Sequence, residues 1–237
     1  MKKLLITLLA VSGLAFADGH GNHSDTNDVY YAYYSLTANN PPAVVAAMDK
    51  FAASDCFEKQ KAAVTLVGEL FNGKSLRTHT FVVTHNNAKE MDESFAINSS
   101  CPEYAEFLTA LAGASTPTEE WLAKSLFEGG DWTKDTVFQT FEINVRNEDA
   151  YLAAYKEFTE AMTEKGQIPG SYGVERVIAG KGFSHFAFIG ASNLEQLMAF
   201  NALLTMKNPD FKKFQTKIQK NRRVVRRSIV MPIKAWD

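Results

Sequence analysis

The sequence of 237 residues contains few of the residues that mark specialised protein classes. Two cysteines exclude a disulfide-dense miniprotein, and 14 glycines and 7 prolines exclude a collagen-like repeat. Several catalytic patterns are also absent: a P-loop, the glycine pattern of dinucleotide-binding proteins, Cys-x-x-Cys, a nucleophile-elbow serine and His-x-x-x-His. After residue 17 no apolar run is long enough to cross a bilayer. These absences leave a globular protein whose sequence does not identify a reaction.

The composition itself is that of a folded protein, with 46% apolar, 12% aromatic and 22% charged residues. The net charge of −2 conceals an uneven distribution. Residues 18–135 carry 8 Lys and Arg against 17 Asp and Glu, a net charge of −9, whereas residues 136–237 carry 15 against 10, a net charge of +5. Opposite charges favour an interface between the two halves, although they would equally steer an external partner.

The amino terminus has the pattern of a secretory signal peptide over residues 1–17. Two lysines precede an apolar stretch, and Ala15 and Ala17 form a small-x-small cleavage site. A polar leader, which we expect to be flexible, follows over residues 18–27. Because no cysteine near the cleavage point offers attachment for a lipid, we expect a soluble periplasmic or secreted protein, for which nucleic acid is not a natural partner.

Cleavage after Ala17 would expose Asp18, Gly19 and His20 as a new amino terminus. A free α-amine, two backbone amides and a histidine at the third position can place four nitrogens in a plane around Cu(II) or Ni(II). Gly19 suits this geometry because, unlike proline, it has an amide proton to lose. The sequence therefore predicts a metal site at these three residues, and the alternative is a polar leader in which histidine occurs by chance.

The chain has two cysteines, Cys56 and Cys101. Because we expect the protein to be exported, this even number permits one internal disulfide. In the chain-entropy model, closing a loop of about 46 residues stabilises the fold by roughly 4 kcal/mol. Two buried free thiols are the alternative.

The sequence resembles itself when it is shifted by about 107 positions, which indicates a tandem duplication. Landmark residues of the first copy then fall on equivalent residues of the second. The aligned pairs include Asn40 with Asn147, Ala47 with Ala154, Phe51 with Phe158, Gly73 with Gly180, His79 with His185, Asn87 with Asn193 and Pro102 with Pro209. Their common order and nearly constant offset predict two copies of one unit, over residues 28–134 and 135–237.

Each copy shows the same predicted order of strands and helices. Aromatic and β-branched runs predict strands at residues 29–36 and 137–145, and Asn40 and Asn147 are good N-caps for helices with apolar residues at i, i+3, i+4 and i+7. A hairpin follows in each copy, then a second helix that starts at an asparagine and is interrupted or kinked at a proline, then a final strand. The order β-α-β-β-α-β predicts a ferredoxin-like unit in an α+β protein.

The hairpin strands of both copies are apolar on both alternating faces. Because helices cover only one face of a ferredoxin-like sheet, we expect the two copies to pack sheet to sheet. This arrangement resembles the dimeric α/β barrel superfamily, which includes antibiotic-biosynthesis-type monooxygenases, stress-responsive barrel proteins and haem-degrading relatives, here as a tandem fusion. The resemblance covers nearly the whole chain after the signal and implies an intramolecular α/β barrel. It rests on element order, so no catalytic residue is carried over, and such folds host many functions.

His79 and His185 occupy matching positions at the start of the third strand of each copy. If both point between the sheets, they approach one another at the pseudo-twofold axis, where imidazoles can bind a metal or haem or act as a general base. The alternative is a pair of hydrogen-bonded core histidines. Tyr31, Tyr33 and Phe141 are predicted to line a pocket for a planar apolar ligand, or else to fill a core.

Arg77 and Arg176 lie near the hairpins and are candidates for holding a ligand carboxylate, the alternative being ordinary exposed arginines. Residues 207–227 contain nine basic residues, one acidic residue and an apolar stripe, which predicts a basic amphipathic helix leading into the last strand. This helix could contact an anionic lipid or polysaccharide, form a solvated face, or pair with the acidic first copy.

Three interpretations of the function remain open at this point. The first is an exported barrel that binds a small apolar or aromatic ligand between the repeats, with a Cu(II) or Ni(II) site at its amino terminus. The second is a cofactor-independent or haem-linked oxygenase that uses His79 or His185. The third is a non-catalytic envelope interaction protein that acts through its basic helix. In each case we expect a monomer or homodimer.

Overall fold

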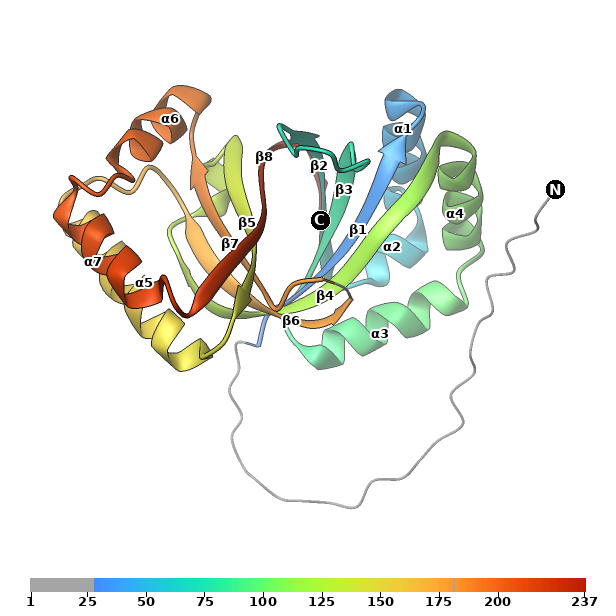
Figure 1. Cartoon of the computed structure of the whole chain (residues 1–237). Coiled ribbons are helices and arrows are strands. Elements are labelled where there is room, and N and C mark those ends of the chain that lie inside the picture. Colours follow the sequence, from blue (N-terminus) through green and yellow to red (C-terminus); the bar gives the residue numbers. More distant parts are fainter. Residues whose placement is uncertain (1–27, 181) are drawn as a thin grey trace, which may run out of the picture.

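The computed structural model describes residues 28–180 and 182–237, which form two similar series of strands and helices (Figure 1). The predicted signal peptide (1–17), the leader (18–27) and the metal site that we expect at Asp18, Gly19 and His20 lie outside the described residues. In the described part of the chain, no helix is both long and apolar enough to span a membrane.

The first repeat consists of β1 (Tyr30–Ala38), α1 (Pro41–Ala52), α2 (Asp55–Lys59), β2 (Ala62–Leu70), β3 (His79–His85), α3 (Ala88–Ser99), α4 (Pro102–Ala114) and β4 (Ser115–Gly129). A short 3-10 turn, η1 (Trp132–Lys134), leads to the second repeat. That repeat consists of β5 (Val137–Val145), α5 (Glu148–Glu164), β6 (Tyr172–Gly180), β7 (His185–Ala191), α6 (Leu194–Leu203), α7 (Pro209–Ile218) and β8 (Arg222–Trp236). The first strands of the two repeats begin 107 positions apart (137 − 30), and so do the last strands (222 − 115), as the sequence repeat predicts.

The eight strands close into one antiparallel barrel in the order β1-β3-β2-β8-β5-β7-β6-β4. Two long strands join the repeats: β4 pairs with β1 of its own repeat and with β6 of the other, while β8 pairs with β5 and with β2. Because both outer strands of each four-stranded sheet are paired, the described strands leave no free edge. The predicted α+β fold, two ferredoxin-like repeats packed as an intramolecular α/β barrel, is confirmed.

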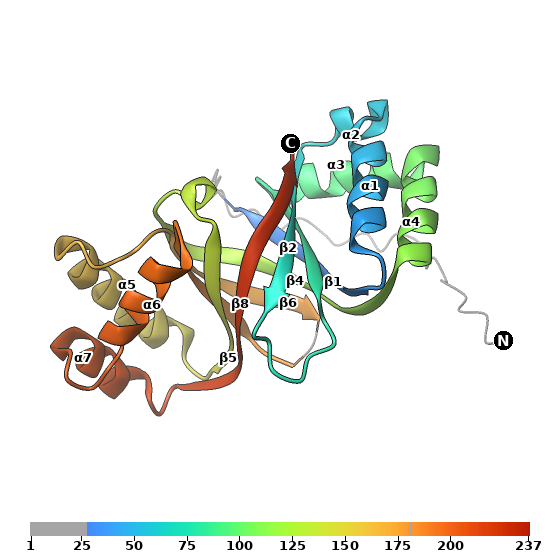
Figure 2. The same cartoon turned by 90° about the horizontal axis from the view of Figure 1, so that it is seen from above.

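The helices cover the outside of the barrel, with α1 to α4 on one side of the strands and α5 to α7 on the opposite side (Figures 1 and 2). Each helical layer encloses its own apolar core against the sheet. Phe51, Leu66 and Phe81 belong to the core of the first repeat, and Tyr151 and Phe214 to that of the second. The inner face of the sheets is thereby left for a third cluster of side chains inside the barrel.

Asparagine side chains start four helices at the predicted positions. Each accepts a hydrogen bond from the backbone N–H three residues later, which satisfies a donor that the first helical turn leaves unpaired. These caps are Asn40, Asn87, Asn147 and Asn193. The prolines do not kink one long helix: Pro102 and Pro209 each occupy the first turn of a separate helix, which Cys101 and Asn208 respectively cap.

Cys56 and Cys101 form a disulfide, with their Cα atoms 6.1 Å apart. The short helix α2, which periodicity did not predict, places Cys56 beside the start of α4. In the second repeat the single 17-residue helix α5 takes the place of α1 and α2. The disulfide therefore ties together the helical layer of the first repeat only.

The basic segment at 207–227 is divided between α7 and β8. Lys213 and Lys217 on α7 form ion pairs with Glu157 of α5 in the same repeat, so these lysines do not pair with the acidic first copy. Arg226 of β8 does reach the first copy, where it pairs with Glu119. Contact of this segment with an anionic surface stays a prediction.

Candidate functional site

Strand alternation decides which side chains enter the barrel. On β3, Thr80, Val82 and Thr84 line an interior cavity, whereas Phe81 and Val83 pack against the helices of the first repeat. The same separation holds on β7, β1 and β6 of the barrel. The inward residues on these strands are Phe186 and Phe188, Tyr31 and Tyr33, and Glu175.

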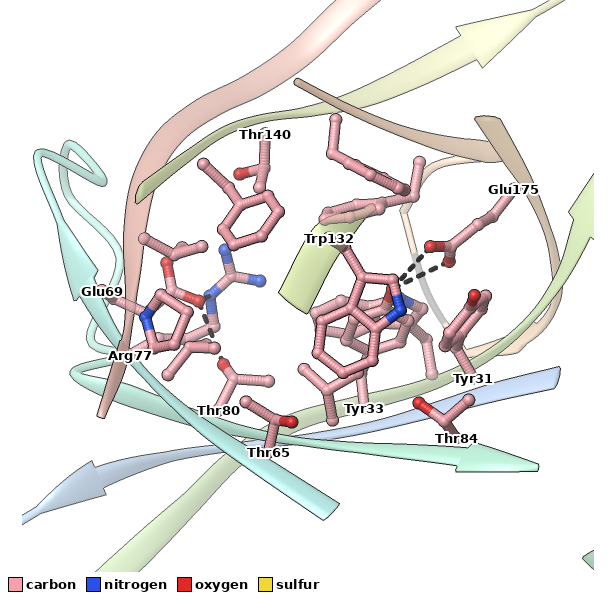
Figure 3. Close-up of a pocket in the computed structure, with 18 residues that line it drawn as sticks. Tyr31, Tyr33, Thr65, Glu69, Arg77, Thr80, Thr84, Trp132, Thr140 and Glu175 are labelled. Carbon is pink, nitrogen blue, oxygen red and sulfur yellow. Dashed lines mark hydrogen bonds and ion pairs between the residues drawn. The ribbon is translucent and has the colours of Figure 1, made fainter. Parts of the chain in front are cut away.

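The cavity between the two repeats has a volume of about 130 Å³ (Figure 3). This is close to the cavity of about 150 Å³ that holds benzene in an engineered lysozyme. Its walls are mainly threonines, valines and aromatic rings. The rings are those of Tyr31, Tyr33, Trp121, Trp132, Phe138, Phe186 and Phe188, and the charged wall residues are Glu69, Arg77 and Glu175. Trp132 is 43% exposed, so it lies where the cavity meets the surface.

Glu175 lies at one end of the cavity and is only 1% exposed. Its two carboxylate oxygens accept the Tyr33 hydroxyl at 2.7 and 2.9 Å, and it forms no ion pair with any residue in the described part of the chain. Burial raises the pKa of Glu175 well above its ordinary value, and the hydrogen bond from Tyr33 opposes that rise. The Tyr33 ring stacks on Trp121, with centroids 4.5 Å apart.

A second tyrosine–glutamate pair lies beside the first. The Tyr31 hydroxyl donates to an Oε atom of Glu128 at 2.8 Å, and the charge of Glu128 contributes to the raised pKa of Glu175. Burial raises the pKa of Tyr31 and of Tyr33 above the ordinary tyrosine value, so both hydroxyls stay protonated donors at neutral pH. Acidic groups therefore dominate this end of the barrel.

Arg77, which precedes β3, lies at the end of the cavity opposite Glu175. Its Nη1 atom donates to Glu142 of β5 at 2.9 Å, and both side chains are 3% exposed, so this ion pair joins the two repeats in a buried environment. Arg226 bridges Glu142, at 3.0 Å, and Glu119 of β4, at 3.2 Å. The Arg77 guanidinium also lies over the Trp121 ring, 5.4 Å from its centroid.

Glu69 completes this network and leaves one oxygen unused. Its Oε1 atom lies 3.4 Å from the Arg77 Nε atom and accepts the Thr80 hydroxyl at 3.0 Å. Its buried Oε2 atom accepts no hydrogen bond from the residues that the structure describes. Burial raises the pKa of Glu69, while the charge of Arg77 lowers it. The wall of the cavity thus contains an unpaired carboxylate oxygen.

The structure does not bring His79 and His185 together. They share the outward face of their strands with Phe81 and Ala187, respectively, and so point towards the helices. His185 bonds to Glu148 at the start of α5, at 2.9 Å. The inward orientation on which their joint catalytic or metal-binding role depended is not found.

The other predicted residues divide between two places. Tyr31, Tyr33 and Arg77 line the interior cavity together. Arg176 points outward, where it pairs with Glu148. Phe141 faces the helices and lines a second cavity of about 430 Å³, which lies between the sheet of the second repeat and α5, α6 and α7.

The described residues do not suit a haem held by histidine. His79, His85 and His185 are the histidines in that part of the chain, and none of them lines either cavity. The interior cavity, at about 130 Å³, is close in size to one that holds benzene and is too small for a haem. Among described residues, the one cluster of possible metal-ligating side chains is Cys56, Cys101 and Glu103, and its two sulfurs are bonded to each other.

Sequence reasoning missed Trp121, Glu142 and Glu175. A signal was present for the two acids, because each is the single acidic residue in an otherwise largely apolar strand, VFQTFEINV and YGVERVIAG. An acid in such a strand either faces solvent or is a buried functional group. The pattern within one strand does not distinguish these cases.

No protein-family model and no curated protein matches this chain. Solved structures match it in fold. A candidate monooxygenase from Lactobacillus acidophilus NCFM is 13% identical, with a TM-score of 0.56 over 87% of this chain and 94% of that chain. A mutant chlorite dismutase from Candidatus Nitrospira defluvii is 11% identical, with a TM-score of 0.54 over 87% and 91%. A heme-binding protein from Thermus thermophilus is 7% identical, with a TM-score of 0.51 over 87% and 92%.

Each of these matches covers most of both chains, so it includes both repeats. The neighbours include monooxygenase-like and chlorite dismutase-like proteins. At these identities the likeness establishes the fold and leaves the function to be argued from the site.

Proposed function

We propose that the protein binds a small molecule with a single aromatic ring inside the barrel, between its two repeats. The observation that carries this proposal is the interior cavity, whose walls hold seven aromatic side chains and only three charged ones. Apolar walls with a few placed polar groups are typical of ligand sites. Rings of Tyr33, Trp121 and Phe186 already stack or tilt against one another, with centroids 4.5 to 6.1 Å apart, and a planar ligand can extend that cluster.

Intrinsic fluorescence provides the test. Of the three tryptophans, Trp121 and Trp132 line the cavity, while Trp236 belongs to the helical core of the first repeat. A Trp236→Phe protein therefore reports on the cavity. We expect one-ring aromatic compounds to change its fluorescence saturably, and two-ring compounds to do so much more weakly because of the small volume.

A pair of variants on β3 supplies the control. Val82→Phe adds a ring inside the cavity, whereas Val83→Phe adds the same ring to the opposite face of the strand, against the helices. Both changes enlarge a packed residue, at a cost of about 1–3 kcal/mol in stability. Binding should be lost in the first variant and kept in the second. Equal binding by the two variants, or no binding by any one-ring compound, would refute the proposal.

A second candidate function, an enzyme that works in the same cavity without a cofactor, is favoured by Glu175. A buried carboxyl with a raised pKa is suited to accept a proton from a bound substrate. The structural neighbours include an anthrone oxidase-like protein, which has the same fold at 8% identity. The test is turnover of each compound that binds, followed by oxygen uptake and mass spectrometry. Loss of turnover in Glu175→Gln, with binding retained, would support this candidate.

Export and the amino-terminal metal site are part of the proposal as well. The sequence motif at Asp18, Gly19 and His20 supports them, given cleavage after Ala17. Amino-terminal sequencing of protein from the periplasm or medium tests the cleavage site, and calorimetry of that protein with Cu(II) tests for uptake of one ion. A different first residue, or no uptake, would remove the metal site and leave the cavity unaffected.

A further inference from the structure

Acidic side chains outnumber basic ones inside the barrel. The buried network at one end contains the carboxyl groups of Glu69, Glu119 and Glu142 and the two guanidinium groups of Arg77 and Arg226. The other end adds a further carboxyl group, that of Glu175, without a basic partner among the described residues. Four acidic side chains therefore share two basic ones, so a positively charged ligand is favoured over a negative one.

Aromatic rings surround the unpaired carboxyl group of Glu175. Phe186 lies directly across from it in the register of β6 and β7, and the Tyr33 ring carries the hydroxyl that donates to it. Trp121 stacks on that tyrosine. Aromatic faces carry partial negative charge and attract an ammonium group, and the attraction grows when water is excluded. A carboxylate among such rings is the arrangement that recognises an organic cation.

The unpaired oxygen of Glu69, at the Arg77 end of the cavity, also favours a ligand that donates a hydrogen bond. The Glu69 side chain is 4% exposed and lines the cavity, and its Oε2 atom accepts no hydrogen bond from the described residues. A buried acceptor without a donor is costly, so a bound molecule that donates a hydrogen bond there is favoured. Protonated amines and ring hydroxyls are donors, whereas a carboxylate ligand is not.

We propose that the ligand of the interior cavity is an aromatic amine in its protonated form, whose ammonium group pairs with Glu175 while its ring packs among Tyr33, Trp121 and Phe186. This inference rests on the proposed function, because it concerns the same cavity and names the class of molecule that the cavity selects. It also differs from the expectation that Arg77 holds a ligand carboxylate, because Glu69 and Glu142 already engage that arginine.

Binding should then depend on pH. The titratable and charged groups that face Glu175 are Tyr31 and Tyr33 of β1 and Glu128 beyond Tyr31 on β4, while β7 presents Phe186. The tyrosines do not ionise near neutral pH, and the charge of Glu128 favours the protonated form of Glu175. The amine binds the ionised carboxylate, so a proton leaves Glu175 when the amine enters. Its affinity should rise with pH until Glu175 is ionised in the free protein.

Three compounds of nearly equal shape test the inference on the full chain: benzylamine, benzyl alcohol and benzoate. We expect benzylamine to bind at least about tenfold more tightly than benzyl alcohol at pH 8, a factor that corresponds to about 1.4 kcal/mol, and benzoate to bind least. Benzylamine affinity should increase between pH 5 and pH 8, whereas benzyl alcohol affinity should change little. Calorimetry in buffers of different ionisation enthalpy should detect release of a proton with the amine only.

Glu175→Gln removes the charge and keeps the size of the side chain, so it should abolish the preference for the amine and leave alcohol binding intact. Glu160→Gln, on the exposed face of α5, is the matched control and should behave as the unchanged protein. If benzyl alcohol binds and benzylamine binds no better, or if Glu175→Gln keeps the preference, this inference is wrong and the proposed function stands. If neither these three compounds nor any other one-ring compound binds, the proposed function itself fails.

Discussion

The buried network around Arg77 allows a quantitative test of how the two repeats are held together. Replacing Arg77 by Met keeps much of the apolar stem and removes the guanidinium group. Glu142 retains Arg226 at 3.0 Å, but Glu69 loses its only basic partner in the described part of the chain and keeps just the Thr80 hydroxyl. Breaking a buried ion pair by removing one partner costs about 3–5 kcal/mol. We therefore expect Arg77→Met to lower the free energy of unfolding by about 3 kcal/mol or more.

Arg176→Met is the matched control. Arg176 also forms an ion pair, with Glu148, but its side chain is 50% exposed and points away from the barrel. Surface ion pairs contribute about 0–1 kcal/mol. Both variants replace an ion-paired arginine by methionine, so the difference between them measures burial and not residue type.

The cost of Arg77→Met should depend on pH. The pKa of Glu69 is raised by burial and lowered by Arg77, so removal of the arginine raises it further. A carboxyl group whose pKa is higher in the folded than in the unfolded state makes the protein less stable as pH rises above its unfolded pKa. The difference in stability between the variant and the unchanged protein should be smallest near pH 4 and should grow towards pH 7.

Urea unfolding followed by fluorescence and circular dichroism, repeated from pH 4 to pH 8, measures these quantities. A double variant keeps the test possible if Arg77→Met is too unstable to analyse. Combining Glu69→Gln with Arg77→Met removes the unpaired charge and should recover part of the lost free energy of unfolding. The reasoning is refuted if Arg77→Met costs no more than Arg176→Met, or if its cost is independent of pH and is not reduced by Glu69→Gln.

Three further predictions concern stability. Replacing both Cys56 and Cys101 by Ser should lower the free energy of unfolding by up to about 4 kcal/mol. Urea unfolding curves of the unchanged protein with and without reductant should show the same loss. A negligible difference between the two curves would contradict the expected contribution of the disulfide. Burial raises the pKa of Glu175, so its ionisation should reduce the stability of the unchanged protein as pH rises from about 4.5. The free energy of unfolding should fall by up to about 1.4 kcal/mol per pH unit, and Glu175→Gln should remove this contribution to its pH dependence. An unchanged slope in the variant would count against a buried, unpaired carboxyl group. Asn147→Ala removes the cap of α5 and should cost about 1 kcal/mol, whereas Asn144→Ala, outside any helix, is a control of the same chemistry and should cost less.

Local features were predictable from the sequence because they depend on neighbours along the chain. The asparagine caps needed only a polar side chain before an apolar helical stripe. The offset of the two copies was visible because equivalent positions keep similar side chains. The length of the last strand of each repeat was not predictable, since β4 and β8 extend over 15 residues by pairing with strands of both repeats.

The interior of the barrel was not predictable in the same way. Alternation assigns successive residues of β3 and β7 to opposite faces of the sheet. Because both faces are apolar, it does not show whether the face with the histidines points into the barrel or towards the helices. The histidines face the helices, and Thr80 and Phe186 face the cavity instead. Arg77 was recognised as a candidate, but its partner Glu142 is 65 positions away and no local pattern links them.

The amino-acid sequence by itself therefore determined the repeat, the order of strands and helices and the helix starts, because propensity and periodicity act over a few residues. Closure of the barrel decided the rest. It turned one face of each strand inward, placed Glu175 beside Tyr33 across a separation of 142 positions, and buried acidic and basic side chains of both repeats in one enclosure. Such contacts follow from pairing between distant strands, where geometry in three dimensions and not spacing along the chain sets which charges meet.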